Sequence, residues 1–224
     1  MIAARSFPLM MARWVALAAC ALAVLAAPAE AAQRPRCNLA GRNLAHSRTI
    51  KVVTRSNEDT ETIKLLGCVK PAGRVRTLAE GVQAFTTETA LTLEGVAGTW
   101  VVIRSSSNNQ YGGSTSLRAV DVRTGKSYGV ASESYMIGGP YQGQALSAIA
   151  VNARGYTAAM RDDLTPAGGT AVTVSKRHVV LFDPRGNARE LDSGPPGELD
   201  PGSLILDTHT VLWSHGGLTR YARF

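Results

Sequence analysis

The residues that could support acid–base or metal chemistry are few and scattered. The four histidines stand at positions 46, 178, 209 and 215. Asp207 and His209 are two residues apart, so on an extended strand they would share one side at a spacing of about 6–7 Å. His215 lies six residues further on, about 20 Å along such a strand, which is too far for one coordination shell. We therefore predict no metal site and no cofactor.

Motifs for nucleophilic or phosphate chemistry are also missing from the sequence. Ser214-His215-Gly216-Gly217 is similar to an esterase oxyanion segment, but no strand–elbow–helix pattern follows it, so we interpret it as a hairpin turn. Asp162-Asp163 could ligate calcium, but two acids without further ligands are typical of a solvated turn. The chain has no G-x-S-x-G, H-E-x-x-H or G-x-G-x-x-G pattern. The sequence assigns no catalytic residue.

Two long polar segments are candidates for binding a ligand. They span Ser105–Ser116 and Ser132–Gly143. Long loops on a rigid β scaffold are where binding residues gather, and tyrosines offer amphipathic contact surface for saccharides or peptides. We identify Tyr111, Tyr135 and Tyr141 as candidate ligand contacts. The alternative is that both segments are plain linkers between strands.

Positive charge is concentrated early in the chain. Residues 32–80 contain ten Lys/Arg against four Asp/Glu, whereas residues 81–224 contain twelve of each. A basic segment favours anionic partners such as cell-wall polymers, acidic lipid surfaces or nucleic acid. The alternative is a solvated arginine-rich face. The candidate residues for an anionic partner are Arg34, Arg36, Arg42 and Arg48.

The N-terminus carries the three parts of a secretory signal peptide. Arg5 and Arg13 form a positive region, Trp14–Ala27 is an apolar run of 14 residues, and Ala29-Glu30-Ala31 offers a cleavage site. The run is short for a bilayer-spanning helix, which needs about 20 residues. We predict a signal peptide over residues 1–31, an exported mature chain in the periplasm, cell envelope or medium, and no transmembrane anchor after cleavage. Export makes nucleic acid an unexpected partner, and no basic–aromatic motif supports one.

Two cysteines remain in the predicted mature chain, Cys37 and Cys68. An even number in an exported chain favours a disulfide, whereas the alternative is two free thiols. The bridge would close a loop of about 30 residues, worth about 3–4 kcal/mol in the chain-entropy model.

The rest of the chain contains short β-branched runs bounded by turn residues, and only 77–87 is a candidate helix. Four segments align without gaps: 49–55 (TIKVVTR), 98–104 (GTWVVIR), 155–161 (GYTAAMR) and 209–215 (HTVLWSH). Each leads through a polar stretch into another strand, and the first three continue through a glycine turn into a further one. This predicts an all-β fold of antiparallel four-stranded repeats. The first unit lacks a leading strand and the fourth a trailing one, so we expect Cys37–Leu44 to complete the last unit and close a ring.

A turn motif recurs within these units. It reads Asp121-Val122-Arg123-Thr124-Gly125-Lys126, with a looser copy at Asp183-Pro184-Arg185-Gly186. The pattern resembles the TolB-like group of bacterial β-propellers. The resemblance implies a small, four-blade β-propeller-like domain over residues 48–224, after an N-terminal basic segment at 32–47. A β-sandwich or an open repeat array is the alternative.

Together these features favour a binding or scaffold module of the cell envelope or the extracellular space. Its partner would be an anionic envelope polymer or a protein. The alternative is a propeller-based hydrolase or lyase, since propellers also host enzymes.

Overall fold

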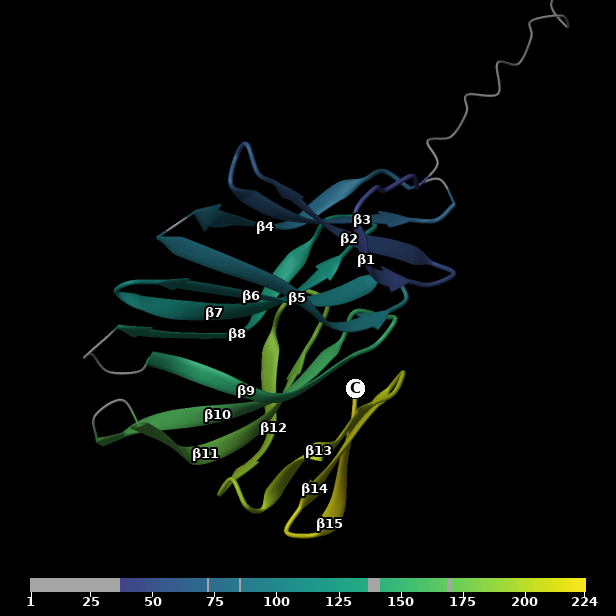
Figure 1. The fold of residues 1–224 in the computed structure, drawn as a ribbon. Coiled ribbons are helices and arrows are strands. Elements are labelled where there is room, and N and C mark those ends of the chain that lie inside the picture. The colour runs from purple at the N-terminus through teal and green to yellow at the C-terminus, as the bar shows by residue number, and fades with distance from the viewer. Residues whose placement is uncertain (1–36, 72, 85, 137–141, 169–170) are drawn as a thin grey trace, which may run out of the picture. The chain divides into compact units, whose positions relative to one another are not determined.

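The computed structural model describes residues 37–71, 73–84, 86–136, 142–168 and 171–224 (Figure 1). The predicted signal peptide (residues 1–31), Arg34, Arg36 and Tyr141 lie outside the described residues.

The described residues form fifteen β-strands and no helix, which confirms the all-β fold class. In chain order the strands are β1 (Arg42–His46), β2 (Ile50–Asn57), β3 (Thr62–Val69), β4 (Arg76–Ala84), β5 (Thr87–Ala97), β6 (Trp100–Asn109), β7 (Gly112–Asp121), β8 (Ser127–Met136), β9 (Gln142–Val151), β10 (Thr157–Gly168), β11 (Ala171–Phe182), β12 (Ala188–Gly194), β13 (Leu199–Leu206), β14 (Thr210–His215) and β15 (Leu218–Arg223).

Strands that follow one another in the sequence pair antiparallel, except β12 and β13. Strands β1–β12 follow one another in a single hydrogen-bonded order, and β13–β15 form a separate sheet. At β4–β5 and β8–β9, pairing in the described residues is confined to the hairpin ends, at 83–84 with 87–88 and 133–134 with 142–143. The long sheet is therefore divided into three four-stranded meanders. We call β1–β4, β5–β8, β9–β12 and β13–β15 the first to fourth meanders.

The four aligned sequence segments fall on β2, β6, β10 and β14, the second strand of each meander. The repeated strands predicted from the sequence are thus confirmed. Two predictions were wrong. Residues 77–87 contain most of β4 rather than a helix, and the first meander has its own leading strand, because β1 pairs with β2.

Apolar side chains pack between consecutive meanders. Because side chains alternate across a strand, the second strands of the two inner meanders, β6 and β10, each contribute to two interfaces. Val101 and Ile103 of β6 pack with the first meander, whereas Trp100 and Val102 pack with the third. The remaining interface joins the third meander to the fourth through residues that include Ala158, Met160, Val211 and Trp213. Figure 1 shows the resulting order, from the blue first meander to the yellow fourth.

The predicted closed ring does not form in the described part of the chain. None of its apolar clusters joins the fourth meander to the first. The segment expected to close the ring is used elsewhere, since β1 pairs with β2 and Leu39 packs on Val53. The four meanders form an open stack rather than a closed propeller.

The disulfide between Cys37 and Cys68 is present, as predicted, with a Cα–Cα distance of 5.9 Å. It joins the segment before β1 to the end of β3, and the Cys37 amide donates to the Pro71 carbonyl at 3.2 Å. The bridge therefore fixes the N-terminal segment beside the turn between β3 and β4.

Candidate functional site

The turns at one end of the first and second meanders lie together and carry several cations. The turn after β3 is held against the turn after β1 by the Lys70 amide, which donates to the Thr49 carbonyl at 2.8 Å. The Lys70 ammonium donates to the Ser47 carbonyl and to Nε2 of His46, each at 2.7 Å. An ammonium has three N–H donors, so one stays available to a ligand.

A hollow of about 330 Å³ opens between this turn and the turn after β7. It is lined by Val69, Lys70, Pro71, Gly73, Arg74, Val122 and Arg123. The described lining contains three cationic residues and no acidic one. We call Arg48, Lys70, Arg74 and Arg123 the basic turn surface; Arg48 is exposed between Ser47 and Thr49, the residues that bind Lys70.

Asp121 builds the turn that presents Arg123. Its carboxylate accepts from the Arg123 amide at 3.0 Å and from the Thr124 hydroxyl at 2.8 Å, which is the local side-chain capping expected of aspartate in a turn. Gly125 supplies the positive φ, +80°, that the turn requires. The Asp121 side chain is only 4% exposed and its carboxylate lies 3.9 Å from the Arg123 guanidinium, so it fixes the loop more than it neutralises the surface.

The structure places the predicted cationic residues only in part. Arg48 belongs to the basic turn surface, and Arg42 is exposed on β1. Arg34 and Arg36 lie outside the described residues. Sequence reasoning missed Arg74 and Arg123, because they belong to different repeat units. The signal was present, since both follow a strand at the equivalent glycine turn of neighbouring units.

Two of the three predicted ligand tyrosines share one hollow. Tyr111 and Tyr135 are 69% and 41% exposed and line a space of about 250 Å³, together with Met136 and polar residues of β6 and β7. The segment 105–116 is a tight hairpin of β6 and β7 rather than a long loop, and β8 occupies the first part of 132–143. The aromatic surface is therefore carried by paired strands. Tyr141 lies outside the described residues.

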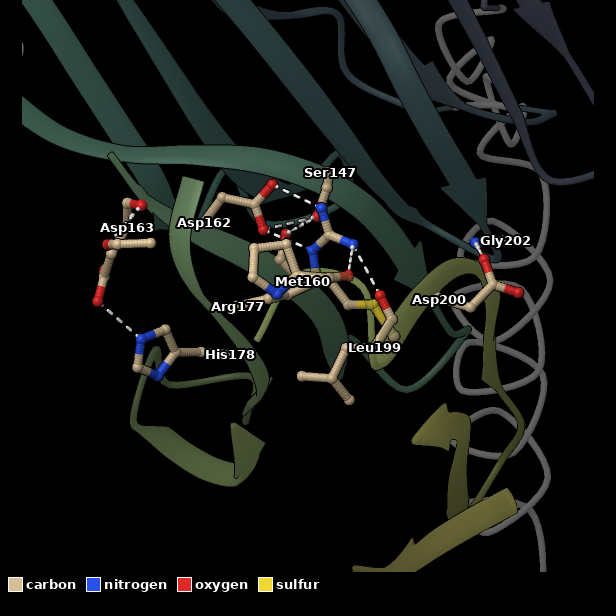
Figure 2. Close-up of polar contacts among 11 residues, drawn as sticks. Ser147, Met160, Asp162, Asp163, Arg177, His178, Leu199, Asp200 and Gly202 are labelled. Atoms are coloured by element: carbon tan, nitrogen blue, oxygen red, sulfur yellow. Dashed lines mark hydrogen bonds and ion pairs between the residues drawn. The ribbon is translucent and has the colours of Figure 1, made fainter. Parts of the chain in front are cut away.

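Asp162 and Asp163 are consecutive residues of β10, not a solvated turn, and point to opposite faces. Asp162 is buried and accepts two hydrogen bonds from Arg177, at 2.6 and 3.0 Å. Arg177 also donates to the carbonyls of Pro196 and Leu199, at 3.1 and 2.7 Å. Figure 2 shows this guanidinium between Asp162 and Leu199. The pair ties the third meander to the start of the fourth.

His178 lies on the other face of the third meander, between two carboxylates (Figure 2 shows the Asp163 side). Its Nε2 is 2.9 Å from Asp163 and its Nδ1 is 3.0 Å from Glu190. Burial pushes the pKa of Asp163 upward, but hydrogen bonds from Gln144 and His178 outweigh it and hold that pKa below its usual value. Because both ring nitrogens are occupied, neither is free to take a proton from a nucleophile. The arrangement is structural.

His215 is held in the same way in the fourth meander. Nδ1 lies 2.8 Å from Asp192 and Nε2 lies 3.0 Å from Glu198, and the Trp213 indole also donates to Asp192 at 2.7 Å. The hydrogen bonds to Asp192 and Glu198 raise the pKa of His215. His209 instead contacts Arg154 at 2.6 Å. No group of metal-binding side chains occurs within the described ranges.

No protein-family model matches the chain, and no curated protein shows significant similarity to it. The resemblance to TolB-like propellers therefore stays a prediction. Within the residues that the structure describes, no helix is long and apolar enough to cross a bilayer.

Proposed function

We propose that this chain is an exported binding module that attaches to an anionic polymer of the cell envelope through the basic turn surface. One observation supports this most: Lys70, Arg74 and Arg123 line a single hollow whose described lining has no carboxylate. Cations brought together from two repeat units raise the local concentration of a polyanion more than scattered surface charges do. The disulfide is consistent with export, because such bonds persist in oxidising compartments.

The two turns that carry the basic turn surface have a well-anchored backbone. The Cys37–Cys68 disulfide anchors the segment beside the first turn, and Asp121 caps the second. Arg76 links the two, since its Nε–H donates to the Arg123 carbonyl at 3.1 Å. Donors on a fixed backbone lose less conformational entropy on binding than donors on a mobile loop.

Equilibrium binding to polyphosphate of defined length tests the proposal. We expect the double variant Arg74→Gln/Arg123→Gln to bind at least tenfold more weakly at 50 mM salt. The dependence of log affinity on log salt should become shallower by about 1.4, taking roughly 0.7 per contact as for single-stranded nucleic acids. Neutral dextran should not bind.

The matched control is Arg185→Gln/Arg220→Gln. It removes the same charge from exposed positions of the third and fourth meanders. We expect it to keep wild-type affinity apart from a small general charge effect. Equal losses in the two double variants would show that net charge, rather than the basic turn surface, governs binding and would overturn the proposal.

A further inference from the structure

A second hollow, between the second and third meanders, contains a cation with no acceptor among the described residues. The hollow measures about 580 Å³, within the range of small-molecule sites. It is lined by Ser116, Leu117, Arg118, Ser127, Tyr128, Gly129, Val130, Ala131, Ser132, Gly143, Gln144, Arg161 and Phe182. We call it the Arg161 pocket.

The Arg161 guanidinium forms no hydrogen bond or ion pair with any described residue, and its Nε is buried without a partner. The guanidinium lies over the Phe182 ring, whose centroid is 5.6 Å from Cζ. Burial lowers the pKa of Arg161. A half-buried guanidinium with no acceptor is costly, because an unpaired buried donor loses its hydration without compensation.

Two of the three corresponding positions in the other repeats are neutralised within the protein, and the third, Arg55, is exposed to solvent. Arg104 donates to Glu94 at 2.7 Å, and His215 lies between two carboxylates. Asp163 and Glu190 lie near enough to Arg161 to favour its charge, but both hydrogen-bond to His178 instead. The chain thus supplies acceptors elsewhere and leaves Arg161 open to the pocket.

The remaining polar groups limit how a ligand could bind. Arg118 also lines the pocket, and one of its N–H groups donates to the Leu78 carbonyl of the first meander at 2.6 Å, whereas Arg161 has no acceptor among the described residues. Burial raises the pKa of Tyr128 to about 12, so its phenol stays neutral, and its hydroxyl is 2.8 Å from both the Gly155 carbonyl and the Thr157 hydroxyl. Phe182 stacks on Tyr128 at 6.1 Å, forming an aromatic wall beside Arg161.

We infer that the Arg161 pocket binds a small organic anion whose oxyanion pairs with Arg161 and whose ring or chain lies along the serine- and aromatic-lined wall. Carboxylate and phosphate match the planar guanidinium fork in two-point hydrogen bonds. Because Nε has no accessible surface, the two terminal nitrogens present the available edge. This site is separate from the basic turn surface and does not depend on the proposed function.

Calorimetric titration with three sugars of similar size tests the inference and distinguishes the two kinds of oxyanion. The probes are glucuronate, glucose 6-phosphate and glucose. We expect at least one charged sugar to bind at least tenfold more tightly than glucose. Arg161→Met should abolish that preference, and Arg161→Lys should keep only part of it because a lysine lacks the fork.

Two control variants distinguish binding at the Arg161 pocket from a general effect of positive charge. Arg220→Met, at an exposed position of the fourth meander, should bind as the wild type does. Arg74→Gln/Arg123→Gln should keep sugar-acid binding even where it loses polyphosphate. If Arg161→Met does not fold, amide chemical-shift mapping of the wild-type protein decides, with shifts expected at Gln144, Arg161 and Phe182. Equal binding of the three sugars, no binding of any, or shifts elsewhere would overturn the inference.

Discussion

Replacing Asp162 by alanine should destabilise the fold more than most single substitutions. The side chains of Asp162 and Arg177 are 7% and 11% exposed, so the substitution leaves a buried guanidinium without its counter-ion. Breaking one side of a buried ion pair costs about 3–5 kcal/mol. Since domains of this size lose about 2–4 °C of Tm per kcal/mol, Tm should fall by about 6–20 °C.

Urea unfolding followed by tryptophan fluorescence measures the effect, since Trp213 lies in the adjoining interface between the third and fourth meanders. The apolar double variant Asp162→Leu/Arg177→Met should recover much of the loss, because neither charge is then buried alone. Recovery will be incomplete, since Arg177 also satisfies the carbonyls of Pro196 and Leu199. A loss below about 1 kcal/mol for Asp162→Ala would show that the pair behaves as an exposed one, since exposed pairs are worth no more than that.

Three further predictions concern the rest of the stack. The pKa of His215 is raised in the folded state, so its stabilising contribution is complete below its unfolded pKa, about 6.5, and is lost as pH rises through the folded value. The free energies of unfolding of wild type and His215→Gln should therefore differ most near pH 6 and converge toward pH 9. A difference that stays constant with pH would contradict this. Reducing the Cys37–Cys68 bond should cost about 3–4 kcal/mol in calorimetry with and without reductant, whereas an unchanged Tm would show that the loop constraint contributes little. Gly155→Ala should lower the free energy of unfolding by about 1–3 kcal/mol in urea, because the φ of Gly155 is +87° and an added Cβ would meet the Trp100 ring. A variant as stable as the wild type would show that the Trp100 ring can move aside freely.

The repeat could be predicted from the sequence because its signals are local. A β-branched run, a polar stretch, a second run and a glycine turn recur in each unit, and each signal depends on only a few neighbouring residues. The position of the second strands on β2, β6, β10 and β14 follows from that pattern. The cysteine pair could be predicted for a similar reason, since the two thiols of the predicted mature chain allow only one pairing.

Whether the ring closes could not be predicted in this way, because it depends on which meander the N-terminal segment pairs with. We expected residues 37–44 to complete the last unit, because the fourth unit lacks a trailing strand in the sequence. In the structure, the disulfide and the packing of Leu39 on Val53 hold it on the first meander. The helical pattern of 77–87 likewise gave way to tertiary context, since residues 76–82 of β4 pair with β3.

The candidate sites depended even more on packing between units. Asp162 appeared to be in a solvated turn because its partner, Arg177, is fifteen residues away on the next strand. The basic turn surface joins Arg74 and Arg123 from different meanders, and no spacing rule links them. Arg161 was visible as the cationic end of a repeat segment, but only the structure shows that it has no acceptor among the described residues.

Amide chemical-shift mapping of the predicted mature chain, residues 32–224, during titration with polyphosphate is the decisive test of the basic turn surface. We predict that the largest shifts fall on Arg48, Lys70, Arg74 and Arg123, and that they reverse on raising the salt concentration. Shifts centred on the Tyr111–Tyr135 hollow, or no shifts at low salt, would contradict the assignment of the basic turn surface as the site of polyanion binding.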